Sequence, residues 1–219
     1  MRPTISPGVH IGEVIRNAVV FNPETTQDIL MNSDLLIDTV VRFFSLLRER
    51  DIDYVLVGGI ALLQYVEGRN TEDIDLIMAV SALEKLPELS LETRDGDFAR
   101  GKFANVKVDV LLTSNPLFEE VRKLHTTSKR FVEQEIVCVT VEGLILLKLY
   151  ALPSLYRQGN FTRVGLYEND VATLIHTHNP PLESIFSELA KYLNGTELEQ
   201  VKQIVEEIQQ RLKRFEERS

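Results

Sequence analysis

Two aspartates separated by one apolar residue, Asp73 and Asp75, lie in the strand-like segment 71–76, after a gap of thirteen residues from the doublet Gly58-Gly59. On a strand, the side chains of residues i and i+2 point to the same face. Two carboxylates this close repel each other unless a cation neutralises them. Mg²⁺ prefers hard oxygen ligands of this kind and also holds substrate phosphates. The segment therefore predicts a strand that presents a metal site suited to phosphoryl chemistry.

A third carboxylate, Asp109, lies in the middle of another alternating segment, 106–112. A lone carboxylate is unfavourable in the middle of a strand unless it has a partner or faces water. One interpretation is that Asp109 completes a site for two metal ions and deprotonates or orients an attacking hydroxyl. The other is that it lies on a solvated edge strand. Asp109 taken alone leaves both interpretations open.

The doublet Gly58-Gly59 ends the apolar segment 54–57 and precedes a short predicted helix, 60–66. A strand that ends in glycines before a helix can present backbone N–H groups to phosphate. Gly-Gly is also a common turn, so the doublet alone is weak evidence. Its combination with Asp-x-Asp and a later strand aspartate favours a phosphate-handling site over coincidence.

Strand patterns come first along the chain and helix patterns last, which predicts an α+β fold: a small mixed β-sheet core flanked by helices, followed by a helical C-terminal region. We predict an N-terminal arm at 1–33, the core at 34–140 and the helical region at 141–219. The predicted strands are 54–57, 71–80, 91–94, 98–102, 105–113 and one or two within 130–140. The predicted helices are 35–47, 60–66, 81–89, 116–124, 142–152, 155–158, 162–178, 182–193 and 197–218.

The net charge of −9 argues against nonspecific binding of nucleic acid by the whole surface. Between Arg100 and Arg163, however, ten Lys and Arg residues outnumber six Asp and Glu residues. This basic segment either binds a phosphate-rich partner or is ordinary solvated surface. The single cysteine, Cys138, excludes an internal disulfide. With no long apolar stretch and no signal-like N-terminus, we expect a cytoplasmic protein that does not bind membranes.

The three carboxylates and the glycine doublet together resemble the nucleotidyltransferase fold of the DNA polymerase β superfamily. The segment from Arg69 to Leu76, Arg-Asn-Thr-Glu-Asp-Ile-Asp-Leu, is also similar to the Arg-x-Thr-x-Asp-Ile-Asp-Leu wording of the bacterial abortive-infection nucleotidyltransferases, the toxins of type IV toxin–antitoxin systems. Those proteins carry a lysine in a helix after the sheet and an aspartate in the next long helix, which match Lys148 and Asp170. The resemblance spans about residues 55–174.

The resemblance implies a role for each matching residue. Gly58 and Gly59 would contact the triphosphate of an NTP, and Asp73 and Asp75, with Asp109, would bind Mg²⁺. Lys148 would neutralise phosphate charge, and Asp170 would hold that lysine or touch the nucleotide. Arg69 would reach a phosphate or pair with a neighbouring glutamate. Lys148 as a surface lysine and Asp170 as a helix-dipole residue remain open alternatives.

The function we expect is a metal-dependent nucleotidyltransferase that moves a nucleoside monophosphate from an NTP to an acceptor hydroxyl. The toxin-like resemblance implies a tRNA end as the acceptor and an antitoxin as a partner. A protein hydroxyl or a small molecule such as an aminoglycoside is also open. The alternative is a non-catalytic module of the same fold that binds a nucleotide or a partner protein.

Overall fold

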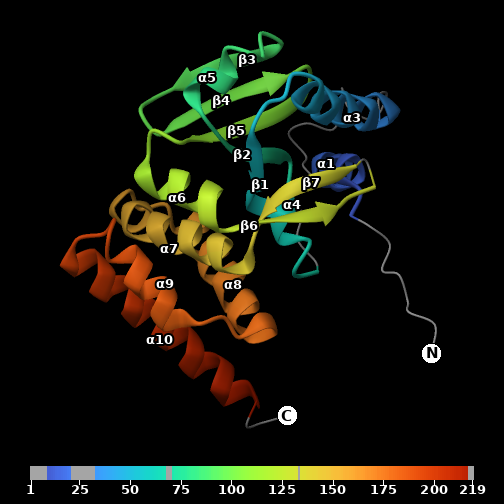
Figure 1. The fold of residues 1–219 in the computed structure, drawn as a ribbon. Coiled ribbons are helices and arrows are strands. Elements are labelled where there is room, and N and C mark those ends of the chain that lie inside the picture. Colours follow the sequence, from blue (N-terminus) through green and yellow to red (C-terminus); the bar gives the residue numbers. More distant parts are fainter. Residues whose placement is uncertain (1–8, 21–32, 68–70, 133, 217–219) are drawn as a thin grey trace. The chain divides into compact units, whose positions relative to one another are not determined.

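The computed structural model describes residues 9–20, 33–67, 71–132 and 134–216 (Figure 1). The chain divides into two compact units, Met1–Val139 and Thr140–Ser219. The first unit contains all the described strands, and the second is helical. The α+β class and the helical C-terminal region predicted from the sequence are confirmed.

The first unit is built on a seven-stranded mixed sheet in the order β3-β4-β5-β2-β1-β7-β6. β2 is central and pairs antiparallel with β1 and parallel with β5. β1 in turn pairs parallel with β7. The strands are β1 (Tyr54–Val57), β2 (Asp73–Met78), β3 (Leu89–Arg94), β4 (Phe98–Phe103), β5 (Val106–Leu112), β6 (Thr126–Arg130) and β7 (Glu135–Val139).

One face of this sheet is apolar and is covered by helix α3 (Ser33–Glu49). The ring centroids of Phe43 on α3 and Phe103 on β4 are 5.1 Å apart, and those of Phe44 and Tyr54 are 6.0 Å apart. Helix α1 (Ile11–Val20) packs on α3 and buries Ile11. Part of the predicted N-terminal arm is therefore a core helix, whereas residues 1–8 and 21–32 lie outside the described residues.

The other face of the sheet is covered at one end by helix α6 (Pro116–Leu124). The Asn115 side chain caps this helix by accepting a hydrogen bond from the backbone N–H of Leu117. Phe118 of α6 packs edge-on against Phe98 of β4, with ring centroids 5.5 Å apart. Because strand side chains alternate, Phe98 and Phe103 point to opposite faces, so α6 and α3 lie on opposite faces of the sheet.

The second unit consists of α7 (Val141–Arg157), α8 (Phe161–His178), α9 (Leu182–Leu189) and α10 (Gly195–Glu216). The sequence predicted a break in the first of these helices near Pro153, but α7 continues through it. Leu149, Leu152 and Leu155 on both sides of Pro153 are buried. The packing of this apolar stripe outweighs the one hydrogen bond that a proline removes.

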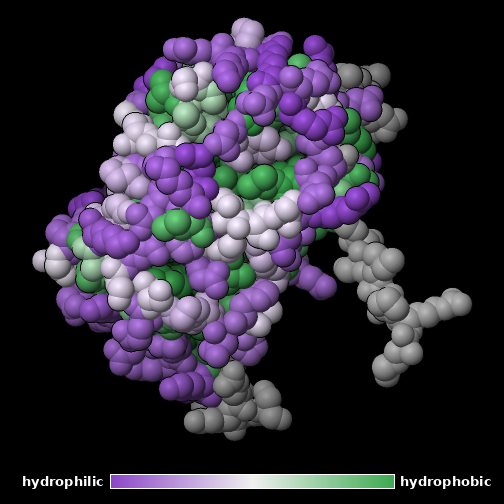
Figure 2. All heavy atoms as spheres, viewed as in Figure 1, coloured by the Kyte–Doolittle hydropathy of each residue, from purple (hydrophilic) through white to green (hydrophobic). Residues whose placement is uncertain are grey.

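Three boundaries in the first unit also differ from prediction. Helix α4 (Gly58–Leu62) starts at the glycines themselves, and α5 (Val80–Leu83) is a single turn. Strand β6 begins at Thr126, directly after α6, where the sequence has no apolar alternation; its pairing with β7 forms it. Within the described ranges, no helix combines the length and the apolar character that crossing a membrane requires. Hydrophilic residues cover most of the face seen in Figure 2.

Candidate functional site

The pairing of β2 with β5 brings the three predicted acids to one face of the sheet. Asp75 is in register with Asp109, and Asp73 is in register with Lys107. Neighbouring strands are about 4.8 Å apart, and residues in register share a face. Asp73 and Asp75 share that face because they are two residues apart. The apolar neighbours on β2, Ile74 and Leu76, are fully buried on the α3 face.

Basic side chains lie beside the acids on the same face. Arg100 on β4 is in register with Asp109, and its Nε lies 3.3 Å from Asp109 Oδ2. Lys107 Nζ lies 3.1 Å from Glu72 Oε2. The hydrogen bond to Glu72, with further attraction from Asp73 and Asp109, raises the pKa of Lys107. The acids therefore lie in a mixed-charge row rather than in isolation.

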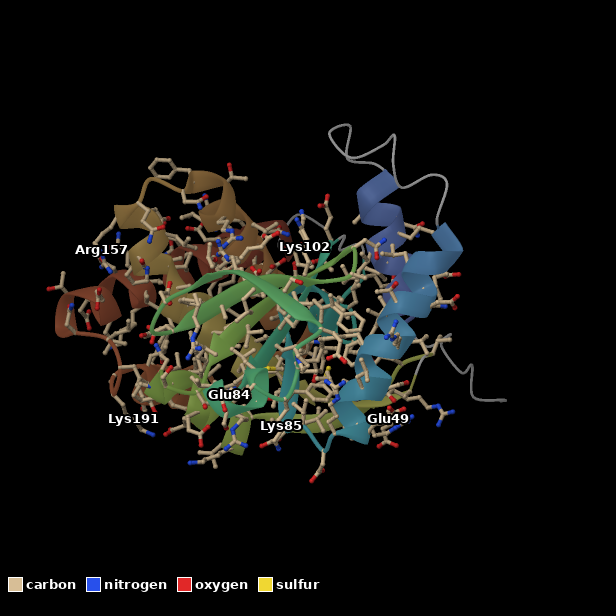
Figure 3. The ribbon with its side chains drawn as sticks, turned by 90° about the horizontal axis from the view of Figure 1, so that it is seen from above. Glu49, Glu84, Lys85, Lys102, Arg157 and Lys191 are labelled. Carbon is tan, nitrogen blue, oxygen red and sulfur yellow. The ribbon has the colours of Figure 1, made fainter. Side chains whose placement is uncertain are left out.

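The next lysine of this row, Lys102 on β4, is labelled in Figure 3. Its Nζ lies 2.7 Å from Glu92 Oε1 on β3. Sequence reasoning included Arg100 and Lys102 only in the count of basic residues. The alternation of β4, with every second residue exposed, was the signal that could have placed them on a solvent-facing strand.

The glycine doublet is packed directly on the carboxylate strand. Gly58 has φ +65°, and a Cβ there would lie 1.9 Å from Asp75 Oδ2. A Cβ at Gly59 would lie 2.7 Å from the Cβ of Thr71 and 2.8 Å from its hydroxyl oxygen. Both glycines are therefore required by close approach, and the turn and the strand form one compact corner.

The donors at this corner suit a hard cation such as Mg²⁺. Among the described residues no three His, Cys, Asp or Glu side chains are gathered into a ready metal site. Mg²⁺ rarely uses such an all-protein cage, because it keeps several waters and binds through one or two carboxylates together with substrate phosphates. Asp73 and Asp75 supply that number of carboxylates on one strand.

The second unit contains the other two predicted residues, and they contact each other. Lys148 on α7 donates a hydrogen bond to Asp170 Oδ2 on α8 at 2.7 Å. Both side chains are buried, with 7% and 3% exposed. The Lys148 ammonium also lies 4.5 Å from the ring centroid of Tyr167, a cation–π contact that the sequence did not predict. The surface alternative for Lys148 is therefore wrong.

Arg69, the remaining predicted site residue, lies outside the described residues. Cys138 is buried in β7, and burial raises the pKa of its thiol to about 12. A buried thiol with this pKa is not a nucleophile near neutral pH.

Several solved structures are similar to this chain. One is a crystal structure of an antigenic nucleotidyltransferase-like protein from Paracoccidioides brasiliensis, with 17% identity and a TM-score of 0.47, covering 74% of this chain and 91% of that one. Another is the solution structure of the antibiotic-resistance factor ANT(2'')-Ia, with 10% identity and a TM-score of 0.49, covering 83% of this chain and 98% of that one.

A crystal structure of ANT(2'')-Ia in complex with adenylyl-2''-tobramycin has 12% identity and a TM-score of 0.45, covering 64% of this chain and 98% of that one. No protein-family model matches the chain, and no curated protein matches its sequence. With TM-scores below 0.5, none of these structures tells what this chain binds or does.

Proposed function

We propose that this chain is a Mg²⁺-dependent nucleotidyltransferase that transfers a nucleoside monophosphate from an NTP to an acceptor hydroxyl. The observation that carries the proposal is the in-register pairing of Asp75 with Asp109, beside the glycine turn that is pressed against Asp75. Three acids on one face, next to backbone that closely approaches them, are a combination that phosphoryl transfer uses and that a purely structural sheet face does not need.

In the proposed reaction the acceptor oxygen attacks the α-phosphorus of the NTP. A new P–O bond forms, the bond to the bridging oxygen of the β-phosphate breaks, and pyrophosphate leaves. Asp109 receives or orients the acceptor proton, since it lies next to Asp75 and on the side of β4. Asp73 and Asp75, together with Asp109, would hold the Mg²⁺ ions, which supply neutralisation of phosphate charge.

Lys148 is proposed to offset phosphate charge, with Asp170 as the residue that holds it. Burial explains why the two residues need each other. An isolated ammonium out of water would lose its proton, whereas a carboxylate at 2.7 Å favours the charged form. The acceptor is proposed to be a hydroxyl of an RNA end, as the toxin-like resemblance implies, with a protein or small-molecule hydroxyl as the competing choices.

The direct test is incubation with each α-³²P-labelled NTP, Mg²⁺, and total RNA, total protein or a panel of small hydroxyl compounds. Wild type is compared with the Asp73→Asn/Asp75→Asn variant and with Asp38→Asn, an exposed position on α3 that serves as the control. We expect label transfer by wild type and the control and loss of transfer in the double variant. Unchanged transfer in the double variant would show that the assigned site is wrong.

The same assay separates the enzyme from the non-catalytic module. A module would bind an NTP, seen as an increase in melting temperature, and transfer label to none of the three acceptor classes. If an antitoxin-like protein is a partner, it would co-purify with the full chain and suppress the transfer.

A further inference from the structure

The residue with an unexplained position at this corner is Thr71, two residues before Asp73. Its hydroxyl oxygen lies where it would be 2.8 Å from a Cβ at Gly59. The side chain is half-buried, and within the described part of the chain nothing hydrogen-bonds its hydroxyl. A threonine held this close to backbone, with its hydroxyl unused, calls for a reason beyond packing.

The turn itself has no side chain that could bind a phosphate. Helix α4 reads Gly58-Gly59-Ile60-Ala61-Leu62, and Ile60, Ala61 and Leu62 are all fully buried. Backbone N–H groups are therefore the only donors that α4 offers. Any hydroxyl that assists them has to come from a neighbouring segment, and Thr71 is the one that the Gly59 backbone touches.

The arrangement along the strand is ordered. Because β1 and β2 are antiparallel, the chain leaving Val57 runs back along β2 toward its start. Gly58 lies against Asp75 and Gly59 lies against Thr71, so the doublet spans the position of Asp73 between them. Gly59 has no positive φ, so its lack of a side chain serves only to let Thr71 approach.

We propose that the Thr71 hydroxyl is a phosphate-binding group, which donates a hydrogen bond to the triphosphate of the NTP held at the Gly58-Gly59 turn. The inference rests on the proposed function and names a residue that it did not include. A hydroxyl donor contributes binding energy to a phosphate without adding charge, and a bond to a charged oxygen contributes about 1.5–3 kcal/mol. Removing it should therefore weaken binding about tenfold or more.

The test compares Thr71→Val, which keeps the branched shape against Gly59 but lacks the hydroxyl, with Thr71→Ser, which keeps the hydroxyl. Thr127→Val, on β6 of the same sheet, is the matched control. The affinity of each protein for the four NTPs and for inorganic tripolyphosphate, all with Mg²⁺, is measured by calorimetry. Tripolyphosphate serves as the probe that has no base.

We expect Thr71→Val to bind every NTP and tripolyphosphate about tenfold or more weakly, by a similar factor for each, while Thr71→Ser and Thr127→Val bind as wild type does. Equal affinities of Thr71→Val and wild type would overturn the inference and leave the proposed function standing. Equal losses in Thr71→Ser and Thr71→Val would also overturn it, because the methyl group would then be what matters.

If Thr71→Val fails to fold, judged by circular dichroism and melting temperature, Thr71→Ser is compared with Thr71→Ala, since that pair isolates the hydroxyl in the same way. If wild type binds neither an NTP nor tripolyphosphate, the proposed function fails and takes the inference with it.

Discussion

Asp75 lies against Gly58 so closely that its Oδ2 occupies the place where a side chain at position 58 would begin, 1.9 Å from an ideal Cβ. The contact joins the end of β1 to the middle of β2 and orients the carboxylate over the turn. The turn and the acid therefore depend on each other, and a change in one disturbs both the fold and the proposed chemistry.

Gly58→Ala should destabilise the protein by about 3 kcal/mol or more, because the new methyl group adds a collision with Asp75 to the strain of a positive φ. Gly159→Ala is the matched control. Gly159 has φ +67°, close to the +65° of Gly58, but its nearest neighbour would be 4.0 Å from the new Cβ. It should cost only about 1–2 kcal/mol. Urea unfolding of both variants measures the difference, and equal losses would contradict this account of Gly58.

Lys148→Met should destabilise the protein by about 3–5 kcal/mol, because it leaves the buried Asp170 carboxylate without its cation. Replacing both residues, Lys148→Met with Asp170→Leu, should recover much of that loss, since no uncompensated charge remains. Chemical denaturation of the two single variants and the double variant gives the coupling energy. A double variant as unstable as the sum of the singles would contradict the pairing.

Arg157→Met is the control for this cycle. The Arg157 side chain is 62% exposed and pairs with Glu197 at 2.6 Å in the same unit. Its loss should cost less than about 1 kcal/mol, because water screens an exposed pair. Arg157 can be found in Figure 3.

Acid should remove the contribution of Glu119. The Arg122 guanidinium, through its hydrogen bonds, lowers the pKa of Glu119 from 4.5 to about 2. A carboxyl whose pKa is lower in the folded state stabilises the protein above its unfolded pKa. The contribution should therefore be complete above about pH 4.5 and should disappear as pH falls through about 2.

The measurement is the difference in urea midpoint between wild type and Glu119→Gln across pH 2–7. We expect a gap of about 1 kcal/mol at pH 7 that closes toward pH 2. Glu84→Gln, an exposed position next to α5, should show little gap at any pH. A Glu119→Gln gap that stays constant down to pH 2 would contradict the assigned cause.

Nucleotide should stabilise the protein only when a divalent ion is present. At an NTP concentration one hundred times the dissociation constant, the stabilisation is about 2.7 kcal/mol, and EDTA should abolish it. Asp75→Asn should respond to neither, whereas Asp38→Asn should behave as wild type. Thermal shift with each NTP, with and without Mg²⁺, checks this. A full shift in EDTA would show that the carboxylates do not hold the metal together with the nucleotide.

The residues alone were enough for features that depend on local pattern. Asp73 and Asp75 had to share a face because a strand alternates, and Ile74 and Leu76 had to face the core for the same reason. Strand patterns before helix patterns indicated the α+β class correctly. These features follow from spacing along the chain, so no knowledge of distant contacts was needed.

Other features depend on contacts between distant segments, and spacing along the chain carries no information about them. The register of β2 with β5 pairs Asp75 with Asp109, and that of β4 with β5 brings Arg100 to the same acid. The contact of Thr71 with Gly59, the burial of Lys148 against Asp170, and the continuation of α7 through Pro153 likewise arise from packing. The free energy of such packing exceeds local preference, so these features follow only from the folded chain as a whole.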